Sequence, residues 1–184
     1  MNYAAVFLDR DGTLIEDMHY PKDSNQVILI PNAIEGMKLM GEKGYLLFII
    51  SNQSGVGRGI IQDSEFKSVH EKFCELLKQA QIKIDGFAYC FHHPDDNCRC
   101  RKPHTDLIPK VFNQKPISFK ESFTVGDKLS DLELADNLGA KGCLVLSGKG
   151  EATQVELNNA NRQFQYAIFP DLLSMAKSLP CIIS

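Results

Sequence analysis

The sequence has no long apolar run. None of its stretches approaches the roughly 18 consecutive apolar residues that a membrane-spanning helix needs. A strand-like run begins soon after Met1, which leaves no place for a secretory signal peptide. We therefore expect a cytoplasmic protein with no membrane partner.

The sequence also lacks an excess of positive charge. Its formal net charge is −3 at pH 7, and the basic residues within 99–102 form only a short cluster. A nucleic-acid-binding surface needs an extended basic patch, so the charge pattern excludes this class of partner. Any anionic ligand must be small and bound locally.

Internal repeats, low-complexity segments and linkers are absent as well. With 43% hydrophobic residues, the chain can bury a core without disulfides, and we expect one domain over residues 1–184. No large exposed apolar segment is apparent, so we expect a monomer. In a reducing compartment the six cysteines are better explained as thiols or metal ligands than as disulfides.

What the sequence has is an alternation of short apolar runs with amphipathic segments. The runs predict strands over residues 4–8, 46–50, 87–91, 122–125, 143–146 and, more weakly, 166–169. Apolar residues at helical spacing predict one helix over residues 34–40 and another over residues 66–80. Asp63 or Ser64 would be the N-cap of the second helix. A third helix is expected over 129–138, ending at Gly139. This order predicts an α/β fold, a doubly wound and mainly parallel sheet with helices on both faces.

The stretch VFLDRDGTL, residues 6–14, places two acids directly after a buried strand. Asp9 and Asp11 would be costly to bury unless positive groups pair with them, so they indicate a site. Ligands of such folds bind at the carboxyl ends of the strands. Other polar groups are expected at the same edge, namely residues 51–53, residues 126–128 and Lys102.

These residue types suit phosphoryl transfer. A carboxylate can attack phosphorus to form an aspartyl-phosphate if the negative charges are offset. Asp9, the backbone carbonyl of Asp11 and Asp127 would supply oxygen ligands for Mg²⁺, and Lys102 would neutralise the phosphate. The Asp11 side chain could exchange the proton of the leaving oxygen, and Ser51 could hold the transferring oxygens.

The motifs DRDGT, SNQSG, RKP and GDKLSD occur in this order between about residues 4 and 146. Together they resemble the four motifs of the haloacid dehalogenase superfamily of phosphatases. The resemblance implies a Rossmann-like fold in which Asp9 is the nucleophile and Asp11 the general acid/base. It places Ser51, Lys102 and Asp127 in the second, third and fourth motifs.

A second pattern, CFHHPDDNCRC over residues 90–100, carries soft nitrogen and sulfur ligands. Cys90, His92, Cys98 and Cys100 would fill a tetrahedral Zn²⁺ site completely, which is typical of a structural site. His93 competes with His92 for the histidine position, and the spacing leaves this choice open. Because the RKP motif follows at once, zinc would fix this loop over the site.

The zinc loop and the absence of a large cap insertion resemble the branch of heptose-bisphosphate and histidinol-phosphate phosphatases. The pattern SNQSGVGRG favours the heptose enzymes, which implies a doubly phosphorylated heptose cut at its 7-phosphate, in nucleotide-activated heptose and lipopolysaccharide core synthesis. The expected substrate contacts are Asp17, His19, Tyr20, Asn52, Gln53, Ser54, Arg58, Arg101 and Lys128. Histidinol phosphate, phosphotransfer to an alcohol and a non-catalytic zinc-stabilised binding domain remain as alternatives.

Overall fold

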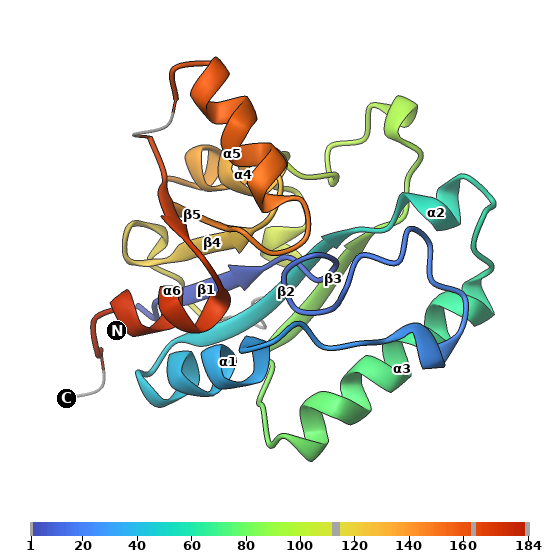
Figure 1. Cartoon of the computed structure of the whole chain (residues 1–184), viewed down its shortest axis with the longest axis horizontal. Helices are drawn as coiled ribbons and strands as arrows, with labels where there is room; N and C mark the ends of the chain where they lie inside the picture. The colour runs from blue at the N-terminus through green and yellow to red at the C-terminus, as the bar shows by residue number, and fades with distance from the viewer. Residues whose placement is uncertain (1, 112–114, 163–164, 183–184) are drawn as a thin grey trace.

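The computed structural model describes residues 2–111, 115–162 and 165–182. Six parallel strands in this part of the chain form one sheet, in the order β3-β2-β1-β4-β5-β6 (Figure 1). Their bounds are Ala5–Leu8 (β1), Leu46–Asn52 (β2), Gly86–Cys90 (β3), Phe123–Gly126 (β4), Lys141–Val145 (β5) and Ala167–Phe169 (β6). The predicted α/β fold with a parallel sheet is confirmed.

The central strand β1 explains why both faces of the sheet are covered. All four of its residues are buried, and it pairs with β2 on one side and β4 on the other. Val6 and Leu8 contribute to one apolar core, whereas Ala5 and Phe7 contribute to another. A strand that is apolar on both faces is stable only between two layers of other elements.

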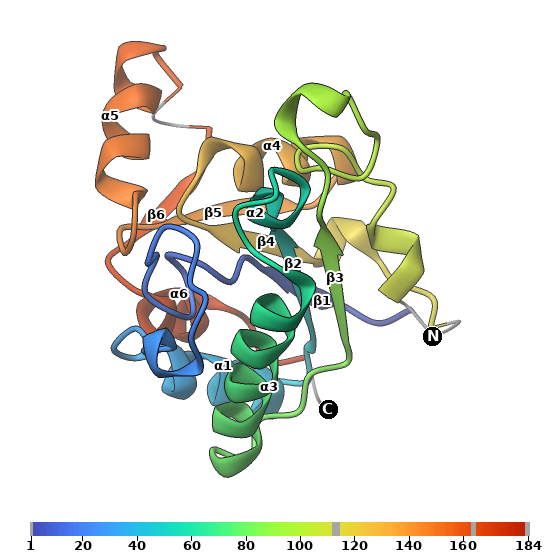
Figure 2. The same ribbon diagram turned by 90° about the vertical axis from the view of Figure 1, so that its right-hand side faces the viewer.

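Helices supply these two layers (Figures 1 and 2). The first core takes residues from α1 (Ala33–Glu42), α3 (Asp63–Gln79) and α6 (Leu172–Ser178). On the other face α4 (Leu129–Leu138) and the 3₁₀ turn η3 (Ile108–Val111) cover the centre, and α5 (Gly150–Asn159) packs with α4 over β5. The short helix α2 (Ser54–Gly57) directly follows β2 and Gln53.

Most predicted boundaries agree with the structure within two residues. The helix α4 ends at Gly139, whose φ of +69° gives the expected left-handed cap. The predicted N-cap of α3 was wrong. Gln62 occupies that position with extended backbone, and its N–H donates to the Glu65 carboxylate at 2.7 Å. Asp63 is instead the first helical residue, where an acid still favours the positive end of the helix.

The segments that follow β1 and β2 leave the carboxyl edge of the sheet open. Residues 9–32 contain only the turn η1 (Ser24–Gln26), and residues 53–62 contain only α2. Neither segment holds a cap domain, as the sequence predicted. Two further 3₁₀ turns lie elsewhere, η2 (Pro94–Asp96) and η4 (Phe119–Glu121). Among the described residues no helix is long and apolar enough to cross a membrane.

Candidate active site

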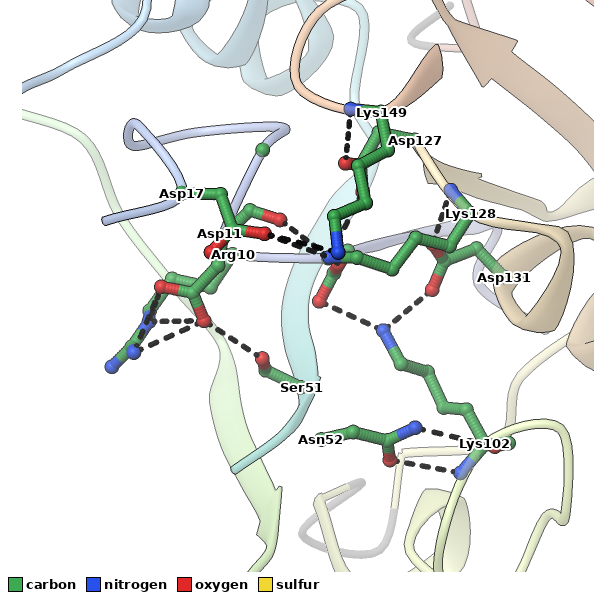
Figure 3. A network of polar contacts seen from close by, with 12 residues as sticks. Arg10, Asp11, Asp17, Ser51, Asn52, Lys102, Asp127, Lys128, Asp131 and Lys149 are labelled. Carbon is green, nitrogen blue, oxygen red and sulfur yellow. Dashed lines mark hydrogen bonds and ion pairs between the residues drawn. The ribbon is translucent and has the colours of Figure 1, made fainter. Parts of the chain in front are cut away.

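Asp9 and Lys102 form a buried ion pair at the carboxyl edge of the sheet. Asp9 directly follows β1, and its N–H donates to the carbonyl of Val125 on the neighbouring strand β4 at 2.9 Å. The Lys102 ammonium lies 2.8 Å from Asp9 Oδ1 and 2.5 Å from Asp131 Oδ1 (Figure 3). It also donates to the carbonyl of Ile50 at 2.8 Å. The lysine is therefore held by three oxygens from three elements.

Electrostatics keep this aspartate ionised. Burial alone would raise the pKa of Asp9, but the ammonium groups of Lys102 and Lys128 outweigh it and hold the pKa below its usual range. Lys102 is likewise kept charged, because Asp131 and Asp9 raise its pKa against the effect of burial. An ionised carboxylate that lines a cavity is suited to act as a nucleophile.

Lys128 contacts the same three oxygens that the sequence assigned to magnesium. Its Nζ lies 3.0 Å from the backbone carbonyl of Asp11, 3.5 Å from Asp9 Oδ2 and 3.3 Å from Asp127 Oδ1. Although that last oxygen is within ion-pair distance, it is buried and accepts no hydrogen bond from the described residues. Burial and the nearby Asp9 carboxylate raise the pKa of Asp127 to about 7.

This donor set fits a divalent cation. Carboxylate oxygens of Asp9, Asp127 and Asp131 all lie within 4.8 Å of one another. The Lys128 ammonium shows that a cation can lie between Asp9, Asp127 and the Asp11 carbonyl. Hard oxygen ligands in a small cluster suit Mg²⁺. Three buried carboxylates face two ammonium groups, so the site carries an excess of negative charge. A divalent ion would make the net charge positive, which favours binding of a phosphate.

Two glycines allow the loops of the site to approach each other. A Cβ on Gly12, whose φ is +88°, would lie 2.1 Å from Asp127 Oδ2. One on Gly148 would meet the same oxygen at 2.4 Å. The N–H of Lys149, the next residue, donates to this oxygen at 2.8 Å. Any larger side chain at either glycine would displace the Asp127 carboxylate.

The Asp11 side chain is turned away from the oxygen cluster. Its carboxylate lies against the guanidinium of Arg10 (Figure 3). It also accepts a hydrogen bond from Gln53 Nε2 at 2.5 Å. Ser51 Oγ lies 3.4 Å from the same carboxylate. One residue thus offers its backbone carbonyl to the candidate cation site and its side chain to a separate position. Its role as a general acid/base stays a prediction.

A cavity of about 290 Å³ opens beside these groups. It is lined by eight of the nine predicted substrate contacts: Asp17, His19, Tyr20, Asn52, Gln53, Ser54, Arg101 and Lys128. Arg58, the ninth, is exposed and does not line the cavity. The side-chain amide of Asn52 accepts a hydrogen bond from the N–H of Lys102 at 2.9 Å and donates one to its carbonyl at 3.2 Å. Asn52 therefore holds the loop as well as lining the cavity.

The predicted zinc ligands come together in the loop after β3. Cys100 Sγ lies 3.3 Å from Cys90 Sγ, 3.6 Å from Cys98 Sγ and 3.1 Å from His92 Nδ1. Around a tetrahedral ion with Zn–S bonds of about 2.3 Å, sulfur atoms would be about 3.8 Å apart, so the cluster has the right size. His93 is not part of it, because its ring accepts a hydrogen bond from the N–H of Asp95.

The comparisons with known proteins agree with this geometry. Residues 99–174 match the HAD-hydrolase-like family model. The D-glycero-beta-D-manno-heptose-1,7-bisphosphate 7-phosphatase of Escherichia coli K12 is 34% identical over 161 residues, covering 83% of this chain and 84% of that protein. The enzyme of the same name from Neisseria meningitidis serogroup B is 34% identical over 149 residues, covering 80% of each chain. The chain belongs to this phosphatase family.

A solved structure extends the likeness to the whole fold of the family. The D,D-heptose 1,7-bisphosphate phosphatase from B. bronchiseptica, complexed with magnesium and phosphate, has a TM-score of 0.85 and 27% identity. The match covers 96% of this chain and 97% of that one. The resemblance to the haloacid dehalogenase superfamily is therefore confirmed, and phosphatases of this superfamily are magnesium-dependent.

Sequence reasoning missed three residues of this phosphatase site. Asp131 is the last residue of the GDKLSD motif and the third residue of α4. A side chain at this helix position lies beside the loop before the helix, so the motif could have indicated that Asp131 reaches the site. Its carboxylate accepts from the N–H of Lys128 at 3.1 Å. Arg10 lies between Asp9 and Asp11 in the chain, and Lys149 lines the cavity. No pattern in the sequence indicated that Lys149, which comes after β5, lies at the same edge of the sheet.

Proposed function

We propose that this chain is a magnesium-dependent phosphatase that hydrolyses D-glycero-D-manno-heptose 1,7-bisphosphate at the 7-phosphate. It would act in the synthesis of nucleotide-activated heptose for the lipopolysaccharide core. The observation that carries the proposal is the buried set of Asp9, Lys102 and Asp127 beside a cavity, in a chain that is 34% identical to phosphatases of this name.

The residues divide the reaction into two steps. An Asp9 oxygen attacks phosphorus, the bond from phosphorus to the sugar oxygen breaks, and Asp11 gives that oxygen a proton. Water then attacks the aspartyl-phosphate, and Asp11 takes a proton from the water. Phosphate leaves and Asp9 is restored. Lys102, 2.8 Å from Asp9, faces the negative charge of the phosphoryl group, and Ser51 can donate to its oxygens.

Magnesium bound by Asp9, the Asp11 carbonyl and Asp127 would supply positive charge to the phosphate oxygens throughout. Lys128 already contacts all three of these groups, which supports the assignment of these ligands. The Lys128 ammonium also lies 3.9 Å from Asp17 Oδ2 at the cavity. A shift towards this second acid would let the lysine contact substrate, as the sequence predicted.

Zinc is proposed to be structural and bound by Cys90, His92, Cys98 and Cys100. All four positions of a tetrahedral ion would then be filled by protein, so no position would be open for a substrate. Burial raises the pKa of the Cys90 thiol to about 12, so a cation is needed before this group becomes a thiolate ligand. Such thiolate sites persist in a reducing compartment, in keeping with the proposed location in the cytoplasm.

Arg101 is proposed to bind the phosphate that is not cleaved. It lines the cavity one residue before Lys102, and its Nη1 is buried without a hydrogen-bond partner among the described residues. A guanidinium can bind phosphate oxygens in a bidentate manner, and such a contact contributes roughly 1.5–3 kcal/mol. The bisphosphate should therefore exceed its monophosphate in kcat/KM by about 10-fold or more.

The test is a phosphate-release assay with magnesium. Its substrates are both anomers of the heptose bisphosphate, heptose 7-phosphate, histidinol phosphate and 4-nitrophenyl phosphate. Arg101→Ala should remove most of the preference for the bisphosphate and leave the aryl phosphate nearly unaffected. Arg99→Ala is the matched control, because this exposed arginine of the same loop is paired with Asp106 and does not line the cavity.

The same assay separates the alternatives. Faster turnover of histidinol phosphate would replace the proposed substrate while keeping the mechanism. Transfer of phosphate to added glycerol, seen as glycerol phosphate, would indicate a phosphotransferase. No phosphate release from any compound, together with zinc bound, would favour a binding domain. Gel filtration would test the monomer.

A further inference from the structure

Arg10 is a buried guanidinium beside the reacting groups, and the proposed function gives it no role. It lies between Asp9 and Asp11 in the chain, and only 1% of its surface is exposed, which makes it the largest fully buried side chain described. Its Nε and Nη2 atoms lie between 3.0 and 3.2 Å from the two carboxylate oxygens of Asp11. Burying an arginine is costly, and a stacked or paired arrangement of this kind is needed to offset it.

Gln53 completes the arrangement around the Asp11 carboxylate. Arg10 Nη2 donates to Gln53 Oε1 at 2.9 Å, which directs the Gln53 Nε2 towards Asp11 Oδ2 and Ser51 Oγ, at 2.5 and 2.9 Å. Both ends of the amide are therefore occupied. The Asp11 carboxylate is therefore held by two groups, the guanidinium of Arg10 and the amide of Gln53.

The guanidinium of Arg10 also lies over two aromatic rings. The rings of Phe66 and Tyr89 lie 5.7 and 5.8 Å from its Cζ, within the range of a cation–π contact. The Tyr89 hydroxyl in turn lies 3.0 Å from His70 Nδ1. These neighbours come from α3 and β3, so the position of Arg10 is set by the body of the fold and not by a loop.

We propose that Arg10 is a positioning residue for Asp11. Its guanidinium holds the side chain of the proton-exchanging residue away from the cation ligands and towards the cavity, while the backbone carbonyl of Asp11 stays with Asp9 and Asp127. The inference rests on the proposed phosphatase reaction, because it assigns Arg10 to the proton transfer. It predicts that Arg10 matters wherever Asp11 exchanges a proton, with the leaving oxygen in the first step and with the attacking water in the second, and that it does not matter for the first step with an aryl ester.

The leaving group provides the test. A sugar alkoxide is a poor leaving group that depends on Asp11, whereas 4-nitrophenolate leaves without a proton. We therefore compare Arg10→Lys, which keeps a charge but loses the planar fork, and Arg10→Met, which keeps the length. The substrates are the heptose bisphosphate and fructose 6-phosphate as alkyl esters, and 4-nitrophenyl phosphate as the aryl ester. Asp11→Asn is the reference.

Both Arg10 variants should lower kcat for the alkyl esters by about 10-fold or more, with KM changed less than about twofold. In a single turnover they should release 4-nitrophenolate within about threefold of the native rate, followed by slow hydrolysis of the aspartyl-phosphate. The ratio of the alkyl-ester rate to the aryl-ester rate, each relative to native, summarises the effect. Gln53→Leu, which leaves the Arg10–Asp11 pair intact, should lower this ratio by a smaller factor. Tyr89→Phe keeps the ring and loses only the hydroxyl, so it should leave the ratio unchanged.

The proposal would be overturned if the Arg10 variants lost rate equally with alkyl and aryl esters in the single turnover. It would also be overturned if their rate with the alkyl esters were unchanged. Thermal melting and zinc content of each variant show whether it is folded, and Gln53→Leu decides the matter if both Arg10 variants unfold. The native enzyme reports separately on the proposed function. If it cleaves fructose 6-phosphate but not the heptose bisphosphate, the substrate is wrong while the Arg10 comparison still holds. If it releases phosphate from neither ester class, both proposals fail.

Discussion

The two proposed metal sites differ in what holds them. The oxygen cluster is built at the ends of β1 and β4, its carboxylates are buried, and two lysines already balance their charge. The thiol cluster depends on a loop in which Cys90 alone belongs to a strand. Cys98 is partly buried, and the segment between the ligands has only a single 3₁₀ turn, η2.

This difference separates a preformed site from one that its ion must organise. The sheet brings the oxygen ligands together through packing and backbone pairing, so loss of magnesium should remove activity and leave the fold intact. The zinc loop has no apolar interior of its own, so much of its folding free energy must come from the metal. Each of the following changes tests one side of this contrast.

Asp9→Asn should have the largest effect. It removes the proposed nucleophile and should lower phosphate release by about 10⁵-fold or more, because a neutral amide attacks phosphorus far less readily than a carboxylate. Zinc content and the unfolding temperature should stay close to native values. Substantial phosphate release by this variant would contradict the covalent mechanism, and loss of zinc would contradict the independence of the two sites.

Cys98→Ser should remove zinc, which Asp9→Asn should leave in place. Elemental analysis should find about one zinc per native chain after dialysis and almost none in the variant. Arg101 and Lys102 follow the loop directly, and small displacements of positioned groups can cost about 10²-fold in rate, so kcat/KM should fall by up to that factor. Cys74→Ser is the control, since this partly buried thiol lies on α3 outside the cluster. A native chain without zinc would refute the assignment.

Magnesium binding should weaken as the pH falls below about 7. The pKa of Asp127 is raised to about 7 by burial and by Asp9, above its unfolded value of 3.8. Its protonated form therefore stabilises the metal-free fold below pH 3.8, and this contribution is lost as the pH rises towards 7. Magnesium must displace that proton, so calorimetry should show a dissociation constant rising by up to about tenfold per pH unit. A constant affinity between pH 5.5 and 7.5 would contradict this.

Lys128→Gln should have the smallest effect, and it should be a gain. Its ammonium contacts all three proposed magnesium-binding groups, so removing it should raise the affinity for Mg²⁺ by about fivefold, as a loss of about 1 kcal/mol of charge repulsion allows. The metal-free variant should unfold at a lower temperature. Lys149→Gln removes a charge of the same cavity whose ammonium contacts none of these ligands, and it should change the affinity less. Equal effects of the two variants would mean that only net charge matters.

The sequence predicted the strands and the acids that gather at the candidate site because both depend on local patterns. The apolar runs were continuous, and the acids followed them directly at Asp9 and Asp127. The helices α2, α5 and α6 were not predicted. The first has only four residues, and α5 buries only Gly150, Thr153 and Leu157, too little to show a clear apolar face.

Residues that act through long-range contacts were also beyond the sequence. The pairing of Lys102 with Asp131 joins positions 29 apart in the chain, and only the topology of the sheet brings them together. The same holds for Gln53 beside Arg10, which was expected to contact substrate and is bonded to a guanidinium 43 positions away. The choice between His92 and His93 required the turn η2, in which His93 serves as the N-cap.

The loop that carries the thiol cluster is anchored at both of its ends. Cys90 is the neighbour of Asn52 in the β2–β3 register, and the Asn52 side chain holds both backbone groups of Lys102. Near the start of the loop, Gly57 of α2 lies so close that a Cβ there would meet the carbonyl of Phe91 at 2.2 Å, and Figure 2 shows the two segments side by side. The exposed residues 95–97 lie between these anchors. Insertions or deletions there could accumulate in evolution without moving the lysine, so the loop tip is open to divergence while its two ends are not.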